Sequence, residues 1–384
     1  MISRANRGTL AEWWWTVDRW LLFSIIALIS GGLVLSLAAS PPVAERIGVG
    51  NFHFVQRHVI FLIPALLILF GVSLLNLKQA RRAAFAMFLA AVAALILTMF
   101  IGFEVKGARR WISLGVFSLQ ASEFAKPAFV VVCAWLFAEQ ARKPGVPGNL
   151  MAIILLAIML ALLMVQPDLG QSVLVVGVWA AMFFMAGIPW IWIIGLAGLA
   201  VVGLFGAYFS FSHVSGRIDR FITGAGDTFQ VDTGREAIIR GGWLGQGPGE
   251  GTVKRVLPDS HTDFIFAVAA EEFGILICLA LLGIFAFIVV RGLLHALSER
   301  DEFVKLAVSG LVLLFGMQSI INMAVNLQLM PAKGMTLPFI SYGGSSLIAM
   351  AFGMGLVLAL TRNRPDALRH RDVEVGSLTR FAGA

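Results

Sequence analysis

Residues 20–39 read WLLFSIIALISGGLVLSLAA, a run of twenty residues without a charged side chain. About 20 apolar residues in a helix are enough to cross the hydrocarbon core of a bilayer. The run is too long for the apolar part of a cleaved secretion signal, and further apolar runs follow it. It therefore predicts an uncleaved first membrane-spanning helix.

The rest of the sequence repeats this pattern. The chain has 384 residues, of which 59% are hydrophobic and 13% charged, whereas about a quarter of a soluble domain is charged. We expect an all-α polytopic membrane protein forming one integral membrane domain over residues 1–384. The other nine predicted spans are residues 58–76, 84–102, 120–140, 150–165, 171–187, 190–209, 263–290, 303–327 and 345–361.

The distribution of lysine and arginine predicts the orientation. If the N-terminus is cytoplasmic, the inner segments carry sixteen of these residues and the short outer connections carry six. Positive charge is enriched on the cytoplasmic side of membrane proteins. We therefore expect a cytoplasmic segment at residues 1–19, a large periplasmic loop at 210–262 and a cytoplasmic tail at 362–384, in the inner membrane.

The net charge of +7 does not indicate nucleic-acid binding, because the basic residues lie mainly in short loops. The two cysteines, Cys133 and Cys278, lie in apolar spans and suggest neither a disulfide nor a metal site.

Lys126 lies inside a predicted span, about two turns from its outer end. An ionisable residue at such a place indicates function by default, although a lysine can also extend its ammonium to the interface. Asp263 begins another span at similar depth and is the best candidate partner. Its spacing from Ser260 equally suits a residue that only caps the helix N-terminus.

The connection after the third span contains Lys106, Arg109, Arg110 and Trp111. Three basic residues here run against the positive-inside bias. Arginine suits phosphate oxygens, so an anion site is one interpretation and chance placement is the other.

Three further polar stretches fall on the predicted outer side. Residues 241–251 are glycine-rich and are interpreted as flexible backbone near a substrate or as a plain linker. Residues 166–172 are a turn candidate, and residues 326–346 are too polar and broken for a span. The gathering of these features on one side favours a site there.

The sequence resembles the SEDS family (shape, elongation, division and sporulation), which polymerises peptidoglycan glycan strands, over nearly its whole length. Residues 333–338 are similar to the division member rather than the elongation member. One departure is that residues 254–256, Lys-Arg-Val, replace a stretch that often holds an acid in the division member. The motifs that carry the resemblance are residues 109–112, 122–126, 166–170, 258–266 and 333–346.

The resemblance implies lipid II as the substrate, Asp263 as the essential carboxylate and Lys126 as its ion-pair partner. It also implies a class B penicillin-binding transpeptidase and other division proteins as partners at the septum. We expect Asp263 to act as general base, with arginines stabilising the departing pyrophosphate. No cofactor is certain, although a divalent cation, Mg²⁺ or Mn²⁺, often serves pyrophosphate chemistry. The predicted substrate-binding residues are Arg109, Arg110, Trp111, Glu123, His261, Thr262, Lys333, Ser341, Arg217 and Arg220.

Two other functions stay open from the sequence alone. A lipid II flippase or other transporter is the first, because Glu271 and Glu272 lie well inside a predicted span. A division scaffold without catalysis is the second.

Overall fold

The computed structural model describes residues 8–105, 108–115, 117–187, 189–210, 215–216, 219, 223, 228–331 and 334–362. The predicted site residues Lys333, Arg217 and Arg220, together with Lys106, lie outside the described residues.

Ten helices correspond one to one with the ten predicted spans, which confirms the all-α polytopic fold. Seven of them are long and apolar enough to cross a membrane, and α7, α8 and α13 add shorter apolar stretches. The ten are α2 (Arg19–Arg46), α3 (His53–Ser73), α4 (Leu77–Ile101), α5 (Ala121–Arg142), α6 (Gly148–Val165), α7 (Leu169–Met185), α8 (Trp190–Ser210), α11 (Ile265–Ser298), α12 (Glu302–Asn326) and α13 (Gly344–Leu360).

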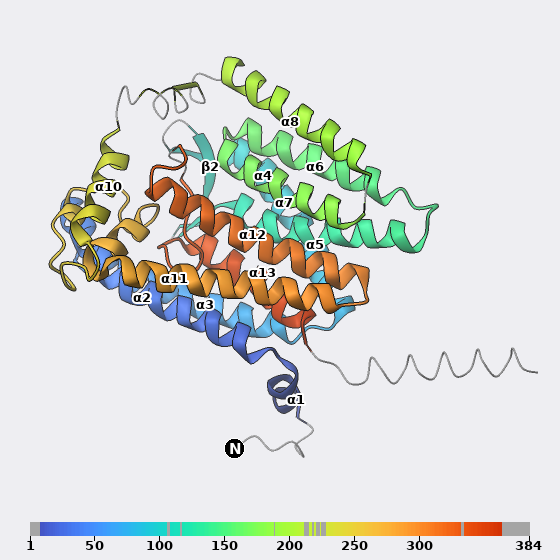
Figure 1. Ribbon diagram of the computed structural model, residues 1–384, viewed down its shortest axis with the longest axis horizontal. Helices are drawn as coiled ribbons and strands as arrows, with labels where there is room; N and C mark the ends of the chain where they lie inside the picture. Colours follow the sequence, from blue (N-terminus) through green and yellow to red (C-terminus); the bar gives the residue numbers. More distant parts are fainter. Residues whose placement is uncertain are drawn as a thin grey trace, which may run out of the picture.

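The helices α5 and α12 form the centre of the bundle (Figure 1). Their most apolar stretches are 83% and 78% buried, whereas no other candidate span exceeds 44%. Lipid-facing positions must be apolar, so only a helix enclosed by other helices can carry polar side chains across the hydrocarbon. Of the buried polar residues described below, α5 carries Glu123 and Lys126, α12 carries Gln318, Asn322 and Asn326, and the neighbouring α7 adds Gln171.

The smaller elements lie at the ends of the bundle. The helix α1 (Thr9–Thr16) precedes α2, while α10 (Phe229–Gly241) lies near the opposite end of α2 (Figure 1). A short 3-10 helix, η1 (Val253–Arg255), follows α10.

The connection between α4 and α5 forms a small antiparallel sheet that the sequence did not predict. Its order is β1 (Phe103–Val105), β2 (Ala108–Ser113), β3 (Ser118–Leu119). Because alternate side chains of a strand point to opposite faces, Arg109 and Arg110 on β2 are directed apart.

The glycine-rich stretch is fixed against α11, so the expected flexibility of its backbone is wrong, while its nearness to a substrate stays a prediction. At Gly274 the helix has φ +77° and a kink. The N–H of Gln246 donates to the carbonyl of Glu271, and the N–H of Ile275 donates to the carbonyl of Gly242. A Cβ on Gly245 would lie 2.1 Å from the carbonyl oxygen of Glu272, which explains why this approach requires glycine.

Candidate active site

Asp263 lies at the start of α11, half-buried, in a turn that precedes the helix. A Cβ built on Gly334 would lie 3.4 Å from its Oδ2 atom, so the carboxylate lies beside the backbone of residue 334. The residue at the N-cap position of α11 is Phe264. The N–H of Ala267 in the first turn donates to Oδ1 of Asn326 at 3.2 Å. Asn326 thus takes part in completing the helix end, and a capping role for Asp263 stays the alternative.

Three consecutive backbone carbonyls, ending at Asp263, are held by hydrogen bonds. The carbonyl of His261 accepts from the N–H of Tyr342 at 3.0 Å, and that of Thr262 accepts from the hydroxyl of Ser341 at 2.6 Å. The carbonyl of Asp263 accepts from the side-chain amides of Asn322 and Asn326, both at 2.9 Å. The backbone that carries the carboxylate is therefore held by residues 341–342 and by α12, which lie far from Asp263 in the sequence.

His261 packs in an aromatic cluster beside this backbone. Its ring centroid lies 4.5 Å from that of Phe54 and 5.4 Å from that of Tyr342. Burial lowers the pKa of His261 to about 4, so the ring is neutral at pH 7. It can shape the site but supplies no positive charge for a pyrophosphate.

The Lys126 ammonium is fully buried in the centre of the bundle, which contradicts the alternative of a lysine extended to the interface. It donates to Oε1 of Glu123 at 2.9 Å, Oε1 of Gln171 at 2.7 Å and Oε1 of Gln318 at 2.9 Å. These residues and Lys126 are called the lysine cluster below. The amide of Gln171 also donates to Glu123 at 2.8 Å.

An ammonium group has three protons, and these three oxygens use all of them. Within the described part of the chain, Lys126 contacts no oxygen of Asp263. The direct ion pair between Lys126 and Asp263 is therefore wrong, and Glu123, one turn away on the same helix, takes the place of the expected partner.

Arg110 binds protein oxygens, contrary to its expected availability for a pyrophosphate. Its Nε donates to the carbonyl of Gln166 at 2.9 Å, and Nη2 donates to the carbonyl of Pro167. Its Nη1 lies 3.7 Å from Oδ1 of Asp168. Burial raises the pKa of Asp168, and the charge of Arg110 opposes that rise. Arg110 thus joins the sheet to the turn at residues 166–168.

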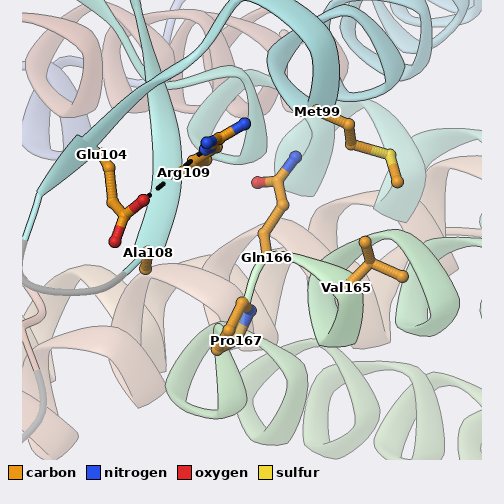
Figure 2. A pocket seen from close by; sticks show the side chains of 7 residues that line it. All are labelled: Met99, Glu104, Ala108, Arg109, Val165, Gln166 and Pro167. Carbon is orange, nitrogen blue, oxygen red and sulfur yellow. Dashed lines mark ion pairs between the residues drawn. The ribbon is translucent and has the colours of Figure 1, made fainter.

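Arg109 lines a hollow of about 320 Å³ together with Glu104 and Gln166 (Figure 2). Its Nε lies 3.7 Å from Oε2 of Glu104, and both side chains are 58% exposed. Of the two arginines, Arg109 is the one whose guanidinium is accessible to a ligand. Trp111, two positions further along β2, is partly buried and pairs with Phe103 of β1.

Glu271 and Glu272 bind the segment that precedes Asp263. The carboxylate of Glu271 accepts from the N–H groups of Val253 and Lys254, at 2.7 and 2.9 Å. Oε1 of Glu272 accepts from the Lys254 ammonium and from the N–H of Gly249. Residues 254–256, where the division member often has an acidic residue, therefore supply Lys254, whose ammonium pairs with the carboxylate of Glu272 on α11. Both glutamates have local partners, so they do not indicate a path for transport.

Sequence reasoning gave no role to Gln171, Gln318, Asn322 and Asn326, although Gln171 and Asn326 lie in the polar stretches 166–172 and 326–346 that it noted. Gln318, Asn322 and Asn326 follow one another at intervals of four residues in an apolar helix, which places them on one face. That spacing was the available signal. Among the described residues, no group of three or more His, Cys, Asp or Glu side chains could hold a metal ion, and a divalent cation stays a prediction.

Comparison with known proteins agrees with this architecture. The family model for cell cycle proteins, named after FtsW, RodA and SpoVE, matches residues 19–365. A probable peptidoglycan glycosyltransferase FtsW of Caulobacter vibrioides is 48% identical over 367 residues, which cover 95% of this chain and 94% of the relative. One from Trichlorobacter lovleyi is 34% identical and covers 90% of this chain and 93% of its own.

Solved structures give the same result. A chain from a structure described as "Structural coordination of polymerization and crosslinking by a peptidoglycan synthase complex" superimposes with a TM-score of 0.75 and 28% identity, covering 90% of this chain and 97% of that one. The rod shape determining protein RodA of Thermus thermophilus gives a TM-score of 0.67 and 29% identity, covering 91% and 97%. The chain therefore belongs to the cell cycle protein family of FtsW, RodA and SpoVE, which is the SEDS family that its motifs resemble.

Proposed function

We propose that this protein is a peptidoglycan glycosyltransferase that polymerises lipid II into β-1,4 glycan strands at the outer face of the cytoplasmic membrane during division. The observation that carries the proposal is Asp263, whose carbonyl is held by Asn322 and Asn326. The carbonyl of the preceding residue, Thr262, is held by Ser341. A carboxylate in fixed geometry at the end of a spanning helix suits a general base. The names of the FtsW relatives support the same class of reaction.

In the proposed reaction, Asp263 accepts the proton of the acceptor's 4-hydroxyl group. The hydroxyl oxygen forms a bond to the anomeric carbon of the donor sugar, and the bond from that carbon to the pyrophosphate breaks. Undecaprenyl pyrophosphate leaves with the bonding electrons. Attack opposite the leaving group inverts the anomeric centre from α to β, and the pyrophosphate ester supplies the driving energy.

Positive charge must stabilise the pyrophosphate as it leaves. We propose Arg109 for this role ahead of Arg110, because Arg110 is bound to the turn at residues 166–168 while Arg109 is exposed at the hollow. Lys333, Arg217 and Arg220 stay candidates from the sequence. Lys126 is too buried to touch a substrate and acts through its cluster.

The proposed cellular setting follows the family. Both termini are cytoplasmic and Asp263 faces the periplasm. The partner is a class B penicillin-binding transpeptidase, in line with the described coordination of polymerisation and crosslinking in the similar complex. The alternative of a transporter loses its sequence support, since Glu271 and Glu272 bind residues 249–254.

The test is glycan synthesis from purified lipid II in detergent, with the transpeptidase partner present and its crosslinking site blocked. We expect chains from the wild type and none from Asp263→Ala or Asp263→Asn, with both variants folded in the membrane. Equal amounts of glycan chains from wild type and variants would support a glycosyltransferase but reject Asp263 as its base. Lipid II movement across vesicles without chain synthesis would favour the transporter.

A further inference from the structure

The side-chain amides of Gln318, Asn322 and Asn326 form a continuous row on α12, which we call the amide ladder. All three are at most 2% exposed. A buried amide without hydrogen bonds is costly, and more so where no water is present. A row of three on one face of a spanning helix therefore needs a set of partners.

Residues 334–337, called the strap, supply part of that set. Gln318 donates to the carbonyl of Thr336 at 3.1 Å, and Asn322 donates to the carbonyl of Met335 at 2.6 Å. Two neighbouring amides of the ladder thus donate to the carbonyls of two consecutive residues of the strap. The strap begins at Gly334, beside the carboxylate of Asp263.

The two ends of the ladder reach the two charged groups of the site. Gln318 accepts from the Lys126 ammonium at 2.9 Å. Asn322 and Asn326 both donate to the carbonyl of Asp263, and Asn326 also donates to the carbonyl of Asn322 at 2.9 Å. The ladder therefore connects a buried cation to the backbone of a carboxylate that this cation does not touch.

We infer that the amide ladder positions Asp263 for the reaction and that Lys126 acts on the site through Gln318 and the strap. This inference rests on the proposed function. Gln318, Asn322 and Asn326 are positioning residues, since their contacts are to Lys126, to the strap and to the backbone of α11, including Asp263.

The first experiment measures kcat and KM for glycan synthesis by Asn322→Leu, which keeps the branched shape of the side chain and removes both donors. We expect kcat to fall at least tenfold while KM stays within about twofold, because the base is misplaced and the substrate surface is intact. The matched control is Ser319→Ala. Ser319 is equally buried on α12, but its hydroxyl donates only to the carbonyl of Phe315 in the same helix.

A second pair of variants separates the links made by Gln318. Gln318→Met removes both the contact to Lys126 and the donor to Thr336, whereas Gln318→Glu keeps an acceptor for Lys126, removes the donor and adds a carboxylate. We expect both variants to lower kcat, with Gln318→Met lowering it more. Equal kcat in wild type and Gln318→Met would reject the connection through Gln318.

Hydrogen–deuterium exchange gives a readout that does not depend on activity. In Asn322→Leu, we expect faster exchange at the N–H groups of Leu337 and Tyr342, which bind Ser341 and His261 in the wild type. Exchange and kcat both unchanged would overturn the inference while leaving the proposed function intact. Failure of the proposed function would instead appear as no synthesis by wild type, with the exchange result still deciding whether the ladder holds the strap.

Discussion

The lysine cluster and a second buried ionic cluster differ in what their contacts accomplish. The second group, called the aspartate cluster, consists of Asp18, Arg291 and His295. Arg291 Nε lies 2.8 Å from Oδ2 of Asp18, and His295 Nε2 lies 3.1 Å from the same oxygen. Asp18 also accepts from the N–H groups of Trp20 and Leu21 at the start of α2.

The contacts of the aspartate cluster account for its presence. Asp18 caps α2 and ties it to the last turns of α11, while Arg291 and His295 are 34% and 24% exposed at their side chains. In the lysine cluster, Lys126 and Glu123 are 0% and 4% exposed. This ion pair caps no helix, and one of its amide partners, Gln318, leads through the strap toward Asp263. A buried ion pair is weak evidence for stability, so the comparison assigns structure to the first cluster and function to the second.

The largest expected effect is that of Lys126→Met on glycan synthesis. We expect activity to fall at least a hundredfold, because the strap and ladder lose their cation. The control is Arg142→Met, which removes an exposed ion pair with Asp301 and should keep activity within about twofold. Similar losses in the two variants would remove the distinction between the clusters.

The double variant Lys126→Met with Glu123→Gln sharpens the first result. Removing one partner of a buried pair costs about 3–5 kcal/mol, because the other charge is left uncompensated. Replacing both charges avoids that cost, so we expect a melting temperature near that of wild type and activity as low as in Lys126→Met. Recovered activity in the double variant would show that Lys126 serves stability alone.

We expect Asp18→Asn to lower stability and keep activity, the reverse of what we expect for the double variant of the lysine cluster. Asparagine can still cap the helix, but the loss of the charge paired with Arg291 should lower stability by about 1 kcal/mol, with glycan synthesis within about twofold of wild type. Thermal unfolding in detergent and the synthesis assay measure the two effects. A tenfold loss of activity at unchanged stability would place the aspartate cluster in the catalytic machinery.

The smallest effect is the pH dependence of that stabilisation. Burial raises the pKa of Asp18, but hydrogen bonds from His295, Arg291 and the N–H of Leu21 outweigh it and lower the pKa to about 2, from 3.8. A lowered carboxyl pKa stabilises the fold above pH 4, and this stabilisation is lost as the pH falls toward 2. With screening, the contribution is about 1 kcal/mol. The difference in melting temperature between wild type and Asp18→Asn should therefore shrink between pH 4 and 2, and a constant difference would contradict this origin.

Much of the fold could be read from the sequence because the membrane imposes it. Ten apolar runs gave ten helices, with ends that moved by a few residues at most positions. The largest change is at the end of α11, predicted at residue 290, which extends to Ser298, and α2 continues through Pro41 and Pro42 to Arg46. Apolar length is a local property, so it needs no knowledge of neighbouring elements.

The pairing of charges was decided by the tertiary structure alone. Similar depth in the membrane suggested Lys126 and Asp263 as partners, but depth leaves the rotation of each helix and the identity of its neighbours undetermined. In the bundle, α5 directs Lys126 toward Gln171 and Gln318, and adjacent arginines on β2 diverge because of the strand's pleat. The sequence determined which residues are costly to keep in a membrane, whereas packing determined which groups satisfy them, since hydrogen bonds depend on distances of about 3 Å that only the folded chain fixes.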